Sequence, residues 1–162
     1  MSTAEAMTNL TDLATVSKEL NAKSNQANQI LMDLEKKLVA MNLGVEAWLS
    51  KDPLQSEPSV EDWEDGNGEW KESKFRTDEV LGFGRLGDRF CLLVKKVTYE
   101  EDFLHGGWKV KEEKEPSHLL QASRQLRIEA LSKIEPLLDR LVKEAKRIVG
   151  LIDQGRKTVD NL

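Results

Sequence analysis

The sequence predicts an α+β fold in which long helices at both ends bracket an antiparallel β-meander. Two observations lead to this prediction. Aliphatic residues recur at alternating spacings of three and four in both terminal segments, as in coiled-coil helices. All nine aromatic residues lie in the middle of the chain, where β-type side chains are concentrated. We expect residues 1–43, 44–115 and 116–162 to form an N-terminal helix, a β module and a C-terminal helical segment of one domain.

The N-terminal segment is predicted to be one long helix, roughly from Asn9 to Met41. No proline interrupts it, and Gly44 is a suitable stop signal. Its seam, called here the N-terminal stripe, is rich in leucine at both ends and small and polar in the centre. The N-terminal stripe consists of Leu10, Leu13, Ser17, Leu20, Ser24, Ala27, Leu31, Leu34, Leu38 and Met41.

The β module is predicted to begin with a short strand at Val45–Ser50 and to end with a strand at Trp108–Glu113. In the last strand, Trp108 and Val110 are expected to face inward. Residues 51–72 contain two prolines and many acidic groups, so we expect an acidic loop there. Within it, a turn centred on Gly66-Asn67 would form a second hairpin with Trp63 opposite Trp70.

A central hairpin is predicted around Gly87-Asp88, a favourable two-residue turn between the strands Glu79–Leu86 and Arg89–Tyr99. The turn fixes the register of the two strands. It places Phe83 opposite Leu92 and Leu81 opposite Val94 on one face, and Gly84 opposite Cys91 and Gly82 opposite Leu93 on the other.

The C-terminal segment is predicted to be helical from the start signal Pro116-Ser117. Pro136 lies inside it and follows a capping-box pattern at Ser132 and Glu135, so we expect a kink or a break near these residues. Both terminal helices adjoin the β module at their inner ends, which predicts an antiparallel, coiled-coil-like pair. The seam, called the C-terminal stripe, consists of Leu131, Ile134, Leu138, Leu141, Ala145, Ile148 and Ile152.

Two glycine-containing motifs resemble ligand sites in spacing alone. Residues 82–87 match G-x-G-x-x-G, but a strand follows instead of the helix that would meet a pyrophosphate. Gly82 and Gly84 on one face are instead typical of a close approach by another element. Asp65, Asn67 and Glu69 alternate oxygen ligands, yet a turn in an acidic loop explains them better than a cation site.

The single cysteine and the two histidines do not have zinc-site spacing. Cys91, His105 and His118 match no zinc pattern, and one cysteine excludes an internal disulfide. A hydrolase built from Cys91, a histidine and an acid stays open, because triads assemble in space. A buried structural cysteine is the favoured interpretation. We therefore assign no catalytic, cofactor or metal residue.

Charge is unevenly distributed along the chain, whose net charge is −5. Residues 45–78 carry four basic and ten acidic groups, whereas residues 117–162 carry nine and six. A net-acidic chain is a poor nucleic-acid binder. The first ten residues do not resemble an export signal, and no apolar run approaches the roughly 20 residues of a membrane span. We expect a cytoplasmic protein that binds neither nucleic acid nor membrane.

The sequence leaves two classes of function open. The two stripes favour a non-enzymatic interaction or assembly protein, most simply a homodimer formed through the helices. The alternative is a small-molecule or peptide-binding module on the β sheet, with or without enzymatic activity. Candidate surface residues are Gly82, Gly84, Trp48 and Trp108 on the sheet, and Arg140, Lys143 and Arg147 on one helix face, which ordinary i,i+4 pairs such as Arg140 with Glu144 also explain.

Overall fold

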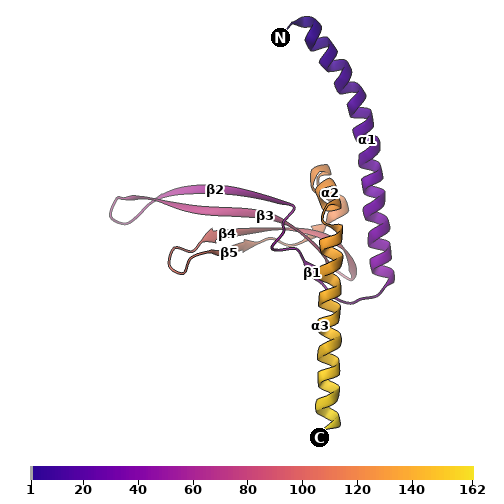
Figure 1. Cartoon of the computed structure of the whole chain (residues 1–162). Coiled ribbons are helices and arrows are strands. Elements are labelled where there is room, and N and C mark those ends of the chain that lie inside the picture. Colours follow the sequence, from indigo (N-terminus) through magenta and orange to yellow (C-terminus); the bar gives the residue numbers. More distant parts are fainter. Residues whose placement is uncertain (1) are drawn as a thin grey trace.

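The computed structural model describes residues 2–162 and confirms the α+β class (Figure 1). Over these residues, three α-helices and a short 3-10 helix accompany a six-stranded antiparallel sheet. The elements are α1 (Thr3–Ala40), β1 (Ala47–Trp48), β2 (Gln55–Glu64), β3 (Trp70–Leu86), β4 (Arg89–Glu101), β5 (Trp108–Glu113), β6 (Ser117–His118), η1 (Leu119–Gln121), α2 (Arg124–Leu131) and α3 (Ile134–Asp160).

The sheet is built on the long hairpin of β3 and β4. β1 and β2 both pair with β3 along one edge, and β5 and β6 both pair with β4 along the other. The predicted hairpin register is confirmed, since Phe83 pairs with Leu92 and Gly82 with Leu93. Gly87 has a φ of 66°, a left-handed conformation that glycine adopts at little cost.

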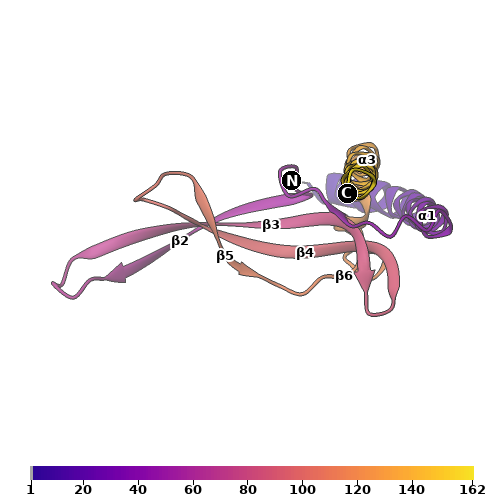
Figure 2. The same cartoon turned by 90° about the horizontal axis from the view of Figure 1, so that it is seen from below.

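The part of the sheet that contains the β2–β3 turn and β5 projects sideways from the helices and is called here the β arm (Figure 2). Much of the expected acidic loop at residues 51–72 is strand β2, which pairs with β3. The connecting turn is longer than expected, because the Asp65 carboxylate accepts the backbone N–H groups of Asn67 at 2.8 Å and Glu69 at 3.0 Å. Trp63 therefore pairs with Lys71 instead of Trp70.

β5 departs from the expected burial pattern. Trp108 and Val110 were expected to face inward, but both are exposed. The physical reason is that no helix packs on this end of the sheet, so the alternating pattern of β5 has no second layer to face (Figure 2).

α1 begins earlier than expected, at Thr3, because Ser2 and Glu5 form a capping box. The Ser2 hydroxyl accepts the Glu5 N–H at 3.2 Å, and the Glu5 carboxylate accepts the Ser2 N–H at 2.7 Å. The chain leaves the helix through Asn42 and Gly44, which have φ values of 50° and 64°. The capping box thus starts the helix well before its first buried residue, Ser24.

The hydrophobic core lies between the helices and one face of the helix-proximal half of the sheet. Leu31 and Leu38 of α1 are 1% and 3% exposed and belong to the same buried cluster as Phe83. Full burial of one leucine stabilises the fold by about 1.5–3 kcal/mol. The other core members are Val45, Ala47, Leu49, Leu54, Leu81, Leu92, Val94, Leu119, Ala130, Leu137 and Leu141.

The C-terminal segment contains two helices, separated at Ser132 and Lys133. The expected helix start at Pro116-Ser117 is wrong, since Ser117 lies in β6 and α2 begins at Arg124 behind the N-cap Ser123. Pro136 lies in the first turn of α3, where its missing N–H removes no helical hydrogen bond. The Ser132 hydroxyl donates back to Glu129 O at 2.8 Å, so it does not cap α3.

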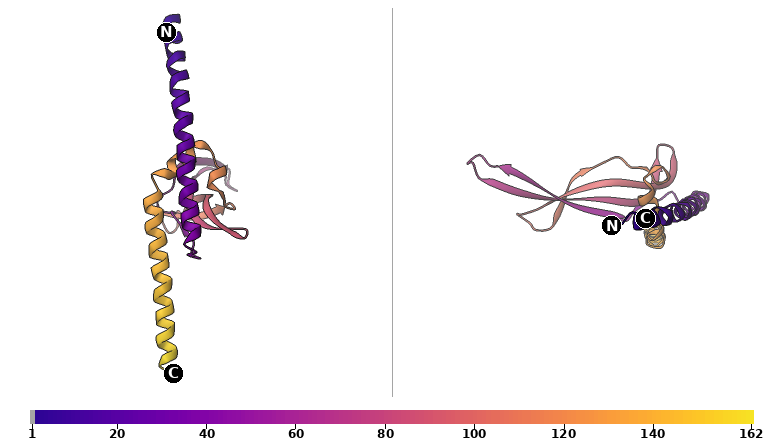
Figure 3. Two further views of the ribbon diagram at one scale, coloured as in Figure 1. Left: turned by 90° about the vertical axis from the view of Figure 1, so that its right-hand side faces the viewer. Right: turned by 90° about the horizontal axis from the view of Figure 1, so that it is seen from above.

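α1 and α3 run in the same direction and project to opposite sides of the sheet (Figures 1 and 3). The expected antiparallel pair within the chain is therefore absent from the described structure. The cause lies in α2, which packs on α1 at the Arg124 Nη2–Asn21 Oδ1 hydrogen bond of 2.9 Å. The C-terminal helices thus begin beside the middle of α1. From there, α3 runs past β1.

Candidate functional site

The first half of α1 is a helical arm with a bare apolar stripe. We call residues 3–23 the N-terminal arm. Leu10 and Leu13 are 62% and 63% exposed, whereas Leu31 and Leu38 on the same N-terminal stripe are buried. One continuous seam is thus occupied over its second half and unoccupied over its first half.

The end of α3 forms a second arm on the opposite side of the sheet (Figure 3). We call residues 142–160 the C-terminal arm. Leu137 and Leu141 are buried against the core, whereas Ile152 is 66% exposed. The remaining large apolar residues exposed on this arm are Val142, Val149, Leu151 and Val159. Several large apolar side chains exposed on one helix are typical of an interaction site.

The glycine face of the sheet is filled by the chain's own side chains. A Cβ atom on Gly82 would lie 2.3 Å from the Trp48 ring and 2.8 Å from the Ala47 carbonyl oxygen. Gly84 lies under Glu46, whose carboxylate accepts the Arg85 N–H at 2.8 Å. These glycines therefore allow the close approach of β1, as the sequence indicated, and leave no open surface for a ligand.

Replacement of Gly82 by alanine should destabilise the protein by about 1–3 kcal/mol, because the new methyl group overlaps an indole ring and a backbone carbonyl. Gly84→Ala is the matched control, since its methyl group meets only the end of the flexible Glu46 side chain at 3.0 Å. Urea denaturation measures both free energies of unfolding. Equal losses in the two variants would contradict the assigned role of Trp48.

Trp108 and Trp48 make different contacts. Trp108 lies on the β arm, 5.2 Å from the Arg76 guanidinium, which also lies over the Tyr99 ring at 4.7 Å. Arg76 in turn pairs with the buried Asp78 at 3.2 Å. Trp48 is instead covered by the Lys95 ammonium group at 4.0 Å from its ring. The two tryptophans are therefore parts of separate intramolecular networks.

The basic face of α3 is solvated. Arg147 pairs with Glu144 at 2.6 Å, in place of the Arg140–Glu144 pair expected from spacing. The hydrogen bond from Arg147 lowers the pKa of Glu144, and the same bond raises the pKa of Arg147. Such exposed pairs contribute at most about 1 kcal/mol. Lys143 and Arg147 lie on the C-terminal arm and contribute to its positive charge.

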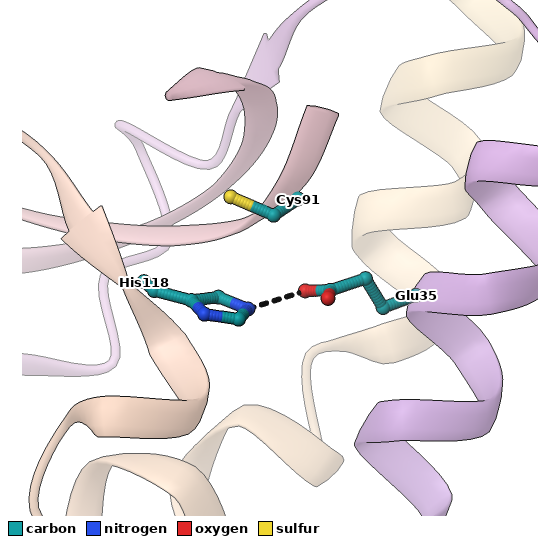
Figure 4. Close-up of side chains that lie close together, drawn as sticks. All are labelled: Glu35, Cys91 and His118. Carbon is teal, nitrogen blue, oxygen red and sulfur yellow. Dashed lines mark hydrogen bonds and ion pairs between the residues drawn. The ribbon is translucent and has the colours of Figure 1, made fainter. Parts of the chain in front are cut away.

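Glu35 of α1, Cys91 of β4 and His118 of β6 meet at the sheet edge (Figure 4). Glu35 Oε2 lies 2.8 Å from His118 Nε2 and accepts the Leu92 N–H at 2.9 Å. Cys91 is 7% exposed, and burial followed by the nearby Glu35 charge raises the pKa of its thiol. A neutral thiol is a poor nucleophile, so the geometry does not favour a cysteine hydrolase.

This cluster joins residues that the sequence did not connect. The histidine that lies near Cys91 is His118, because it is the cross-strand partner of Leu93. His105 instead lies in the turn before β5 and contacts Asp102 at 3.2 Å. Nothing in the sequence indicated Glu35, because a single glutamate off the N-terminal stripe carries no signal. Only the packing of α1 along the edge of β4 brings Glu35 next to Cys91 and His118.

A hollow of about 570 Å³ lies between the end of α1 and the β3–β4 turn. Leu38, Leu43, Phe83 and Phe90 line it, with Arg89 at its border. It lies away from the glycine face and is open to solvent.

Comparisons with protein-family models, with curated proteins and with solved structures found no match for this chain. None of the helices between residues 2 and 162 is both long enough and apolar enough to cross a membrane. Function must therefore be inferred from the arms, the sheet and the edge cluster.

Proposed function

We propose that this chain is a non-enzymatic, cytoplasmic assembly protein and that its two arms bind the arms of a second copy. The observation that carries the proposal is the N-terminal stripe, which is buried from Ser24 to Leu38 and bare from Leu10 to Leu20. A helix of this length is stable in water chiefly when its apolar face is covered. The bare half therefore fits a further helix.

The second copy fits because the arms match in length and direction. At 1.5 Å per residue, the N-terminal arm is about 31 Å long and the C-terminal arm about 28 Å. The arms point to opposite sides, so a twofold axis perpendicular to α1 and α3 brings each N-terminal arm beside a C-terminal arm of the other copy. The rotation also reverses the helix direction, so the pairing between copies is antiparallel.

One antiparallel register gives complementary side-chain sizes. When the numbers of facing residues add up to about 165, Leu10 faces Gly155 and Leu20 faces Ala145 of the second copy. In the same register, Ser17 faces Ile148, which also packs against the core of its own chain, whereas Leu13 faces Ile152 as a pair of two large residues. Large and small residues that alternate across a seam pack without voids or overlap. Gly155 in particular has open space around it within one chain.

Charge also favours pairing between unlike arms. Residues 3–23 carry two basic and three acidic groups, and residues 142–160 carry five basic and three acidic groups. Pairs of like arms would bring equal net charges together, whereas an N-terminal arm beside a C-terminal arm brings opposite ones together. Apolar residues beside the seams, such as Val16, Val142 and Val149, widen the surface to be covered.

The proposal is tested by mass and by cross-linking. Sedimentation of the intact protein at micromolar concentration should give twice the chain mass of 18.4 kDa. In a Cys91→Ser background, the double variant Leu13→Cys/Ile152→Cys should form disulfide-linked dimers on mild oxidation. Thr15→Cys/Ile152→Cys is the matched control, because Thr15 lies off the stripe. A monomer mass would refute the assembly role, and cross-linking by Leu13→Cys alone would replace it with pairing of like arms.

Ligand binding on the sheet is less well supported. Trp48 and Glu46 occupy the space over Gly82 and Gly84, where the alternative function required a pocket. The face that the sequence offered as a binding surface is thus covered by side chains of the same chain.

A further inference from the structure

The edge cluster of Glu35, Cys91 and His118 combines the three donor types that zinc takes from proteins. One thiol sulfur, one imidazole nitrogen and one carboxylate oxygen all lie within 4.8 Å of one another. Figure 4 shows Glu35 of α1 and His118 of β6 pointing toward each other, with Cys91 of β4 beside them. No sequence motif links them, because 83 positions separate Glu35 from His118.

The local fold holds this arrangement for a specific reason. β6 pairs with β4 only at Leu93 and Val94, so the edge of β4 beyond them is free of strand partners. α1 packs along that free edge, and Glu35 accepts the Leu92 N–H there. A hydrogen bond from outside the cluster that orients a ligating carboxylate is typical of metal sites.

We propose that Glu35, Cys91 and His118 bind one Zn²⁺ ion, with water as the fourth ligand. Tetrahedral zinc with bonds of 2.0–2.3 Å separates its ligand atoms by about 3.3–3.8 Å. Through side-chain rotation, the Glu35 Oε2–His118 Nε2 distance of 2.8 Å therefore opens by about 0.5 Å, and separations as large as 4.8 Å close by about 1 Å. The Glu35 and His118 side chains are 18% and 25% exposed, which gives the ion a path from solvent.

Zinc also accounts for the charge balance of the cluster. Cys91 binds the ion as a thiolate, so one proton leaves the thiol for solvent as the Zn–S bond forms. Glu35 contributes a second negative charge, and neutral His118 contributes none. The ion cross-links α1 to two strands of the sheet, at the helix that also carries the N-terminal arm. The competing interpretation is a simple Glu35–His118 ion pair that needs no metal.

The test uses Co²⁺ and Zn²⁺ as probes on the full-length protein after treatment with a chelator. Co²⁺ should produce a thiolate-to-cobalt charge-transfer band, and equimolar Zn²⁺ should remove it. Zn²⁺ at 100 times its Kd should raise Tm by roughly 5–10 °C, and Mg²⁺ should not. A wild-type protein without the band would refute the site.

Variants separate this site from adventitious binding. Glu35→Gln keeps an oxygen acceptor for the Leu92 N–H, so it should fold and yet bind Zn²⁺ at least tenfold more weakly. Cys91→Ser should abolish the cobalt band. His105→Gln is the control, because His105 and Asp102 form the other histidine–carboxylate contact of the described chain. If His105→Gln removes the Tm shift while Glu35→Gln retains it, the binding is adventitious and the proposal is wrong.

Discussion

Replacement of Leu13 by glutamate is expected to convert the dimer into a folded monomer. Leu13 is 63% exposed within one chain, so the substitution removes no contact from the core. In the proposed dimer it removes two buried leucines, one from each copy, and each contributes about 1.5–3 kcal/mol. A loss of at least 3 kcal/mol raises the dimer Kd by at least about 100-fold. Sedimentation across a concentration series measures the change.

Thr15→Glu is the control for this variant. Thr15 is exposed on the same arm, but it lies off the N-terminal stripe and donates its hydroxyl to the Thr11 carbonyl at 3.2 Å. The dimer Kd of this variant should stay within about threefold of the wild-type value, since an isolated surface substitution changes stability by at most about 0.5 kcal/mol. Dissociation by both variants would show that helix propensity or charge, and not the stripe, controls assembly.

The sequence predicted those parts of the fold that depend on local signals. The Gly87-Asp88 turn fixes the β3–β4 register through backbone conformation, and that register is confirmed. The spacing of leucines in the N-terminal stripe likewise identified the face of α1 that is buried, from Ser24 to Leu38. In both cases the residues that carry the signal belong to the same element whose structure they predict.

The errors arose where distant contacts decide the outcome. Alternation in β5 suggested an inward Trp108, but no layer covers that end of the sheet, so the pattern has no core to face. The direction of α3 depends on α2 packing beside Asn21, a contact across about 100 residues. Proline, glycine and acidic residues at 51–72 indicated a loop, whereas pairing with the long strand β3 makes most of it strand β2.

The candidate site was only partly accessible from the sequence. The stripes were visible, because apolar periodicity does not depend on whether a partner is present. Which half of each stripe stays bare could not be predicted, since it depends on where the sheet meets α1. Glu35 is the extreme case: a single glutamate on a helix has no local signal, and only the edge of β4 gives it Cys91 and His118 as neighbours.

Leu31→Ala should reduce the free energy of unfolding by about 2–5 kcal/mol. Leu31 is 1% exposed and belongs to the buried cluster that includes Phe83 and Leu137. Its truncation leaves a cavity between α1 and the sheet, which the rigid hairpin cannot close. The measurement is best made by urea denaturation in the Leu13→Glu background, so that dissociation of the dimer does not contribute to the unfolding transition.

Leu10→Ala in the same background is the matched comparison, because Leu10 occupies the same N-terminal stripe three heptads earlier. It is 62% exposed within one chain, so its truncation should change the free energy of unfolding of the monomer by less than about 0.5 kcal/mol. In the wild-type background, by contrast, Leu10→Ala should weaken the dimer. If Leu10→Ala and Leu31→Ala lower the free energy of unfolding of the monomer equally, the chain covers its own N-terminal arm. The bare stripe, on which the proposal of self-assembly rests, would then not exist.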